Sequence, residues 1–129
     1  MQATRTIVIV DDEELVRDVA CAILKGRGYK VLTAENGEEA MALMRENSAE
    51  ICLMVLDPGI RGLDPWNLIP SLMAMNPDLA IVVSSGSLPE YALREFDLNY
   101  ISGYIQKPYT ATRLRDGVAL ALHSCSIAA

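Results

Sequence analysis

The chain has 129 residues, of which 51% are hydrophobic, and this length and composition predict one domain with a full apolar core. Its formal net charge of -6 and its pI near 4.7 exclude a surface built to neutralise nucleic-acid phosphates. No stretch approaches the roughly 18 apolar residues of a membrane span, and the first apolar run is too short for a signal peptide. We therefore expect a cytoplasmic domain that itself contacts neither nucleic acid nor membrane.

Strand and helix patterns alternate along the whole chain. In chain order they predict strand 7–10, helix 14–25, strand 31–34, helix 38–46, strand 51–56, helix 66–75, strand 79–83, helix 89–96, strand 101–105 and helix 112–122. Three of the strands are almost continuously apolar, which is typical of a parallel sheet covered by helices on both faces. The more mixed strands at 31–34 and 101–105 suit the edges of that sheet.

Residues at the helix ends support these boundaries. Asn36 is expected to cap the second helix, and Asp64 with Pro65 to begin the third, because proline needs no partner at a first helical position. Gly26 and Gly28 follow the first helix, where a residue with positive φ usually ends it. The domain core is expected from about residue 6 to residue 122, within a single domain spanning 1–129, with residues 124–129 as a tail.

The cysteines predict no disulfide. Cys21, Cys52 and Cys125 are odd in number and widely spaced, and cysteine in apolar stretches behaves as a small hydrophobic residue. We expect reduced, buried thiols.

Polar residues stand where several strands end. An alternating chain of this size closes most easily as a doubly wound sheet, whose ligands bind beyond the carboxyl ends of the strands. The residues at those ends are Asp11, Asp12, Asp57, Ser85 and Lys107. Taken singly, the aspartates suit helix caps, the serine a turn and the lysine a surface charge. Together they predict a binding site at one edge of the sheet.

The order and spacing of these motifs resemble the receiver domain of two-component response regulators. The resemblance runs from about Thr6 to Leu122 and is carried by Ile7-Val8-Ile9-Val10-Asp11-Asp12-Glu13, Ala34-Glu35-Asn36-Gly37-Glu38-Glu39-Ala40, Val55-Leu56-Asp57, Val83-Ser84-Ser85-Gly86 and Tyr104-Ile105-Gln106-Lys107-Pro108. It implies an α/β fold of the flavodoxin-like (βα)5 type, a three-layer sandwich with a five-stranded parallel sheet of order 2-1-3-4-5.

The resemblance also implies roles for the acidic residues. Asp57 resembles the phosphoacceptor, and Asp11 and Asp12 resemble the acidic pair that holds Mg²⁺ together with Asp57 and the backbone carbonyl of Gly59, with Mn²⁺ as an alternative ion. Three neighbouring carboxylates repel one another unless a cation lies between them, so the site is expected to be strained without metal. Mg²⁺ prefers oxygen ligands and keeps several waters, which suits this set.

Further residues resemble the parts that complete the site. Lys107 and the Ser85 hydroxyl are expected to cancel charge on the phosphoryl oxygens, and the backbone N–H groups of Gly59 and Gly86 to contact them. Ser85 and Tyr104 resemble a switch pair that responds to the new charge. The surface expected to change is formed by the fourth helix, fifth strand and fifth helix, residues 87–122.

The chain departs from the usual family pattern at two places. The positions four and eight residues after Asp57, usually proline and glycine, are Arg61 and Pro65. A small Gly-Ala pair before the fifth strand is replaced by Tyr100-Ile101, which must repack the loop that leads to Tyr104.

The predicted function is that of a phosphoacceptor, not an enzyme, although such a domain assists its own phosphorylation and dephosphorylation. The expected donor is a histidine kinase or a histidine phosphotransfer protein, and the expected target is a downstream effector or an attached domain. One alternative is a degenerate receiver that acts only through protein contacts. Another is an aspartyl-phosphate phosphatase, which needs a second acid where this chain has Gly59. The chain suits a stand-alone regulator or a module of a hybrid kinase, and we favour the latter slightly.

Overall fold

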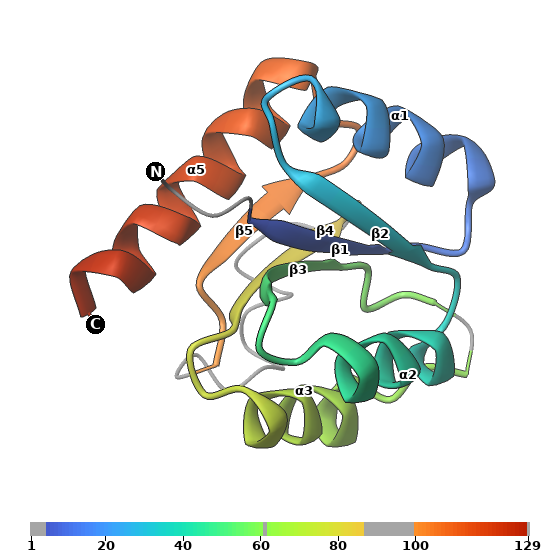
Figure 1. Ribbon diagram of the computed structural model, residues 1–129. Coiled ribbons are helices and arrows are strands. Elements are labelled where there is room, and N and C mark those ends of the chain that lie inside the picture. The colour runs from blue at the N-terminus through green and yellow to red at the C-terminus, as the bar shows by residue number, and fades with distance from the viewer. Residues whose placement is uncertain (1–4, 61, 87–99, 129) are drawn as a thin grey trace.

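A computed structural model describes residues 5–60, 62–86 and 100–128. Its five strands form one parallel sheet of order β2-β1-β3-β4-β5, which confirms the predicted fold class (Figure 1). The strands are β1 (Thr6–Val10), β2 (Lys30–Ala34), β3 (Ile51–Leu56), β4 (Ala80–Ser85) and β5 (Gly103–Gln106). The two strands with mixed sequences are at the edges, as predicted.

Helices cover both faces of this sheet. In Figure 1, α1 and α5 lie on one face, and α2 and α3 lie on the other. The described helices are α1 (Glu14–Lys25), α2 (Gly37–Asn47), α3 (Pro65–Met75) and α5 (Ala111–Ala128). The helix predicted at 89–96 lies outside the described residues.

The continuous apolar character of the central strands follows from this layering. Successive residues of a strand point to opposite faces, so a strand covered on both faces needs an apolar residue at every position. In β3, Leu53 and Val55 belong to the core beneath α1 and α5, whereas Met54 and Leu56 belong to the core beside α2 and α3. The sheet therefore separates two apolar layers and presents the polar ends of its strands at one edge.

Three helix-end predictions are tested by the structure. The Asn36 side chain accepts a hydrogen bond from the Glu39 N–H at 2.9 Å, and the Glu39 carboxylate accepts one from the Glu35 N–H at 2.8 Å. The hydrogen bond from the Glu39 N–H confirms Asn36 as the cap of α2. Helix α3 begins at Pro65, as predicted. After α1, only Gly28 has the predicted positive φ, at 93°, whereas Gly26 is in the right-handed helical region.

Two further predictions are corrected. Helix α5 continues to Ala128 instead of ending near residue 122, because no glycine or proline follows Leu122 to stop it. Cys21 and Cys52 are free thiols as expected, but they are only partly buried. The Cys52 thiol donates a hydrogen bond to the Thr6 carbonyl at 3.3 Å, so this position near the start of β3 tolerates a weakly polar group. The Cys125 side chain lies outside the described set.

Among the helices that the structure describes, none combines the length and apolar character that crossing a bilayer requires.

Candidate functional site

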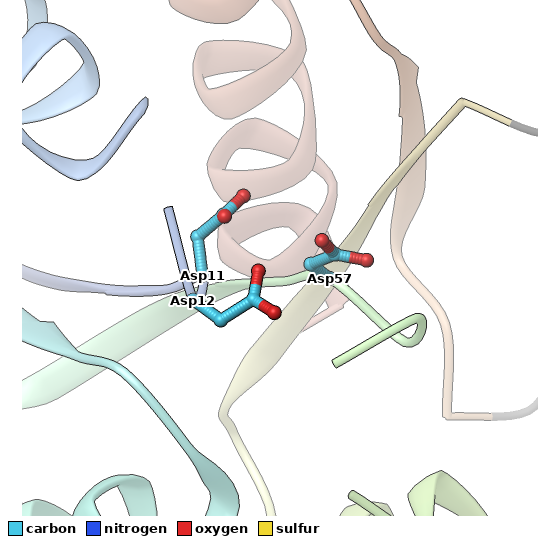
Figure 2. A group of neighbouring side chains, drawn as sticks. All are labelled: Asp11, Asp12 and Asp57. Carbon is cyan, nitrogen blue, oxygen red and sulfur yellow. The ribbon is translucent and has the colours of Figure 1, made fainter. Parts of the chain in front are cut away.

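Three carboxylates meet at the ends of two neighbouring strands. Asp11 follows β1 directly, Asp57 follows β3 directly, and these strands are paired along their length. One carboxylate oxygen from each of Asp11, Asp12 and Asp57 lies within 4.8 Å of the others. Figure 2 shows the three side chains gathered beyond the ends of these strands. Asp11 is buried, Asp57 is half-buried and Asp12 is exposed, so the cluster opens to solvent on the side of Asp12.

Lys107 brings a positive charge to this cluster from the end of β5. Its ammonium donates a hydrogen bond to Asp57 Oδ2 at 2.9 Å and another to Asp11 Oδ2. Burial lowers the pKa of Lys107, but the hydrogen bonds to both carboxylates outweigh it, and the pKa is raised above its ordinary value. The ammonium therefore offsets the repulsion that three neighbouring carboxylates were expected to suffer without a cation.

Backbone N–H groups donate hydrogen bonds to the remaining oxygens of Asp11 and Asp57. Asp11 Oδ1 accepts from the Glu13 N–H at 2.9 Å, and Asp57 Oδ1 accepts from the Gly59 N–H at 2.8 Å. A Cβ atom at position 59 would lie 3.3 Å from Asp57 Oδ1, a tight contact. The absence of a side chain at Gly59 therefore lets its backbone approach the carboxylate closely.

The donor set suits a hard divalent cation. Asp11, Asp12 and Asp57 supply only oxygen atoms, and Mg²⁺ combines one or two carboxylates with several waters. Because Asp12 is exposed, it can bind an ion that keeps part of its water shell. These residues therefore fit Mg²⁺, whereas they offer none of the nitrogen or sulfur ligands that zinc favours.

Ser85 and Tyr104 lie on adjacent strands beside the cluster. The Tyr104 hydroxyl donates to the Ser85 carbonyl at 3.2 Å, and the Lys107 backbone N–H donates to the same carbonyl at 2.8 Å. Both side chains are partly buried, and Gly86, which follows, is exposed. The structure thus links the residues of the predicted switch through one peptide group, while their roles stay predictions.

Sequence reasoning missed two side chains around the cluster. Arg17 donates a hydrogen bond from Nη1 to the Asp11 carbonyl at 2.8 Å, and its Nη2 lies 4.0 Å from a carboxylate oxygen of Glu35. No motif reveals this contact, because its main partner is a backbone atom. Tyr109 packs against the core beneath α1 and α5, and burial raises its pKa above the ordinary value.

An apolar groove of about 500 Å³ begins next to Lys107. It runs between the start of α1 and the residues after β5, and Leu15, Val19, Pro108 and Tyr109 contribute its apolar lining. Leu15 is 75% exposed and Val19 is 47% exposed, so helix α1 presents apolar side chains to solvent here.

Comparison with known proteins agrees with this geometry. The family profile of the response regulator receiver domain matches residues 7–119. The sensor kinase CckA of Brucella abortus is 28% identical over 88% of this chain, and the autoinducer 1 sensor kinase/phosphatase LuxN of Vibrio campbellii is 33% identical over 85%. This chain spans 12% and 13%, respectively, of the lengths of those relatives.

Solved structures show the same similarity. The crystal structure of NtrX from Brucella abortus matches with a TM-score of 0.86 and 27% identity, over 97% of this chain and 29% of that one. A response regulator receiver domain protein from Clostridium thermocellum matches with a TM-score of 0.84 at 21% identity, over 97% of this chain and 99% of the other. At that lower identity the match concerns the fold alone.

Proposed function

Because this chain belongs to the response regulator receiver domain family, we propose that Asp57 accepts a phosphoryl group and that the new charge alters a partner-binding surface. The observation that carries this proposal is the convergence of Asp57, two further carboxylates and the Lys107 ammonium at one edge of the sheet. The donor is a phosphohistidine. Its P–N bond breaks as an Asp57 oxygen bonds to phosphorus, and the histidine leaves with the nitrogen's electron pair.

The surrounding groups suit that transfer. Catalysis of phosphoryl transfer consists mainly of positioning the reactants and stabilising charge on the phosphoryl oxygens. Lys107 already contacts Asp57, so its ammonium needs only a small shift to reach an attached phosphoryl group. The Gly59 N–H points at the other Asp57 oxygen and supplies a second donor. The Ser85 hydroxyl and the Gly86 N–H are proposed as further donors.

A divalent cation completes the proposed site. Mg²⁺, held by Asp11, Asp12, Asp57 and the Gly59 carbonyl, would neutralise negative charge that builds up between the attacking and transferred oxygens. This assignment is supported by the carboxylate oxygens of Asp11, Asp12 and Asp57, which lie within 4.8 Å of one another, and by the exposure of Asp12 to solvent.

The proposed response passes through Ser85 and Tyr104. The hydrogen bond of 3.2 Å from the Tyr104 hydroxyl to the Ser85 carbonyl joins β5 to the end of β4. A movement of Ser85 toward a phosphoryl group would therefore displace the acceptor that holds the Tyr104 side chain. The surface expected to respond is formed by residues 87–122, of which 87–99 lie outside the described residues. Its target is a downstream effector or an attached domain.

The proposed phosphodonor is a histidine kinase or a histidine phosphotransfer protein. The groove lined by Leu15, Val19, Pro108 and Tyr109 supports docking of a protein donor, because an exposed apolar patch next to Lys107 favours association where transfer takes place. Because these proposed donors present their phosphohistidine in the cytoplasm, we place the domain there as well.

The test is phosphorylation by acetyl phosphate in the presence of Mg²⁺, read by intact-protein mass. The unaltered protein should gain the mass of one phosphoryl group, and Asp57→Asn should gain none because an amide is a poor nucleophile. Asp78→Asn is the matched control: Asp78 is exposed in a loop away from the cluster, and this variant should be labelled like the unaltered protein.

Two outcomes would contradict the proposal. Undiminished labelling of Asp57→Asn would move the phosphoacceptor elsewhere, and a complete absence of labelling in the unaltered protein would favour a domain that acts only through protein contacts. Sustained release of inorganic phosphate from many equivalents of substrate would instead favour a phosphatase, although Gly59 offers no acid group two residues after Asp57.

A further inference from the structure

Ser84 has a buried hydroxyl for which the described residues provide no partner. The residue is 2% exposed, and its Oγ accepts or donates no hydrogen bond within the part of the chain that the structure describes. Burying a hydroxyl without a hydrogen bond costs free energy, because water satisfied that group in the unfolded chain. The position next to Ser85 was not among the site residues expected from the sequence, so its polarity needs its own explanation.

The sheet places Ser84 on the same face as the ion-paired residues. Ser84 lies two positions after Val82, Asp57 lies two positions after Val55, and Lys107 lies two positions after Ile105. Those three apolar residues belong to the core cluster beneath α1 and α5. Because side chains alternate along a strand, Ser84 projects to that same face while Ser85 projects to the opposite one.

The side chain of Lys107 must cross β4 to reach its partner. Strand β4 lies between β3 and β5, so Asp57 and Lys107 stand on the two sides of Ser84's strand (Figure 1). The next position of this face after Ser84 is Gly86, which has no side chain. The lysine therefore crosses β4 on the face to which Ser84 contributes a hydroxyl.

We propose that Ser84 is a positioning residue for Lys107 in the phosphorylated protein, an inference that rests on the proposed function. A lysine ammonium has three N–H donors, of which Asp11 and Asp57 accept two in the unmodified protein. When a phosphoryl group is attached to Asp57, the ammonium turns toward it, and this turn directs its third N–H to the Ser84 Oγ. The Ser84 Oγ accepts that N–H and holds the ammonium over β4.

With this role, the Ser84 hydroxyl destabilises the unmodified protein and stabilises the phosphorylated protein. In the unmodified protein, an unpartnered hydroxyl lowers the free energy of unfolding. In the phosphorylated protein, the same hydroxyl stabilises the bound phosphoryl group through Lys107. A residue that only fills space would affect stability without selectively affecting binding at the site.

The experiment compares Ser84→Ala with the unaltered protein, and Ser84→Thr with Ser84→Val, since each pair differs by a hydroxyl. Urea unfolding in chelator reports on the unmodified state. Binding of beryllofluoride in the presence of Mg²⁺, followed by calorimetry, reports on the phosphorylated state, because beryllofluoride imitates an attached phosphoryl group. We expect removal of the hydroxyl to raise the urea midpoint in each pair and to weaken beryllofluoride binding about 3- to 10-fold, the size of one hydrogen bond.

The result that overturns the inference is equal beryllofluoride affinity within both pairs, or a lower urea midpoint for the variants without the hydroxyl. Ser84→Thr should bind beryllofluoride as tightly as the unaltered protein. Weaker binding by a normally folded Ser84→Thr variant would also contradict the inference. If the unaltered protein bound no beryllofluoride and took no phosphoryl group, the proposed function itself would fail. If it bound normally and only the hydroxyl had no effect, the role of Ser84 alone would fail.

Discussion

Lys107 determines the charge balance of the site, because its ammonium joins two carboxylates from different strands. The contacts run from the end of β5 to Asp57 on β3 and to Asp11 on β1. Asp11 is buried, so loss of the ammonium would leave a carboxylate with poor access to water beside a second negative charge. The strand order puts β3 and β4 between β1 and β5, so this one side chain ties together the two ends of the polar edge.

We expect Lys107→Met to lower the free energy of unfolding by about 2 kcal/mol in chelator, because it leaves Asp11 and Asp57 without their shared cation. Added Mg²⁺ should stabilise this variant more than the unaltered protein, since the ion then replaces the positive charge that Lys107 supplied to both carboxylates. Urea unfolding with and without Mg²⁺ measures both effects. Lys30→Met, at an exposed position of β2, is the control and should change neither. Equal stability of Lys107→Met and the unaltered protein in chelator would contradict this account.

At the scale of elements, the packing of α5 on the sheet depends on Gly117. A Cβ atom at this position would lie 2.9 Å from both Cδ1 and Cγ1 of Ile105, so the helix approaches β5 closely there. Since Ile105 is 5% exposed, its side chain has little room to move away. Helix α5 carries part of the proposed output surface, and this contact sets how near to β5 it lies.

Gly117→Ala should therefore destabilise the protein by about 1 kcal/mol. Alanine improves helix propensity by about 1 kcal/mol over glycine, but overpacking a filled core costs about 1–3 kcal/mol. Gly37→Ala is the matched control, because a Cβ there would lie 3.7 Å from Leu68 Cδ2, an ordinary contact. Thermal unfolding of both variants should show a lower midpoint for Gly117→Ala and an unchanged or higher midpoint for Gly37→Ala. Equal gains in both would show that α5 can move away from β5 at little cost.

At the scale of the whole molecule, two raised pKa values make the fold sensitive to alkaline pH. Burial raises the pKa of Tyr109 above its ordinary 10.0, and hydrogen bonds to Asp11 and Asp57 raise that of Lys107 above 10.5 against the effect of burial. A group with a raised pKa binds its proton more tightly in the folded state. Its contribution to stability is therefore complete below the ordinary pKa and is lost as pH rises through the folded-state pKa.

We therefore expect the contribution of these two groups to be constant below about pH 10 and to decline above it. Urea unfolding in chelator across this range, compared with Tyr109→Phe, isolates the tyrosine because phenylalanine has no proton to lose. The variant should lose less stability than the unaltered protein as pH rises. An equally steep decline in both would show that Tyr109 titrates alike in the folded and unfolded states.

Local patterns sufficed to predict most of the architecture. Uninterrupted apolar runs marked β1 and β3 as central strands, and the caps at Asn36 and Pro65 marked helix starts, because each signal depends on residues close in sequence. Where a boundary depended on a missing stop signal, as at the end of α5, the prediction was wrong. The conformation of Gly26 was also not predictable, since Gly28 met the need for a positive φ instead.

The sequence by itself determined that acidic residues end two central strands and that a lysine follows the last strand, because parallel strands bring their carboxyl ends to one edge. Only the tertiary structure decided how these groups are paired. The double contact of Lys107 and the hydrogen bond from Arg17 to the Asp11 carbonyl join residues from separate strands and helices. The burial of the Ser84 hydroxyl without a partner among the described residues likewise follows from packing. Such contacts depend on strand order and on how closely helices pack against the sheet, and no local pattern in the chain specifies either one.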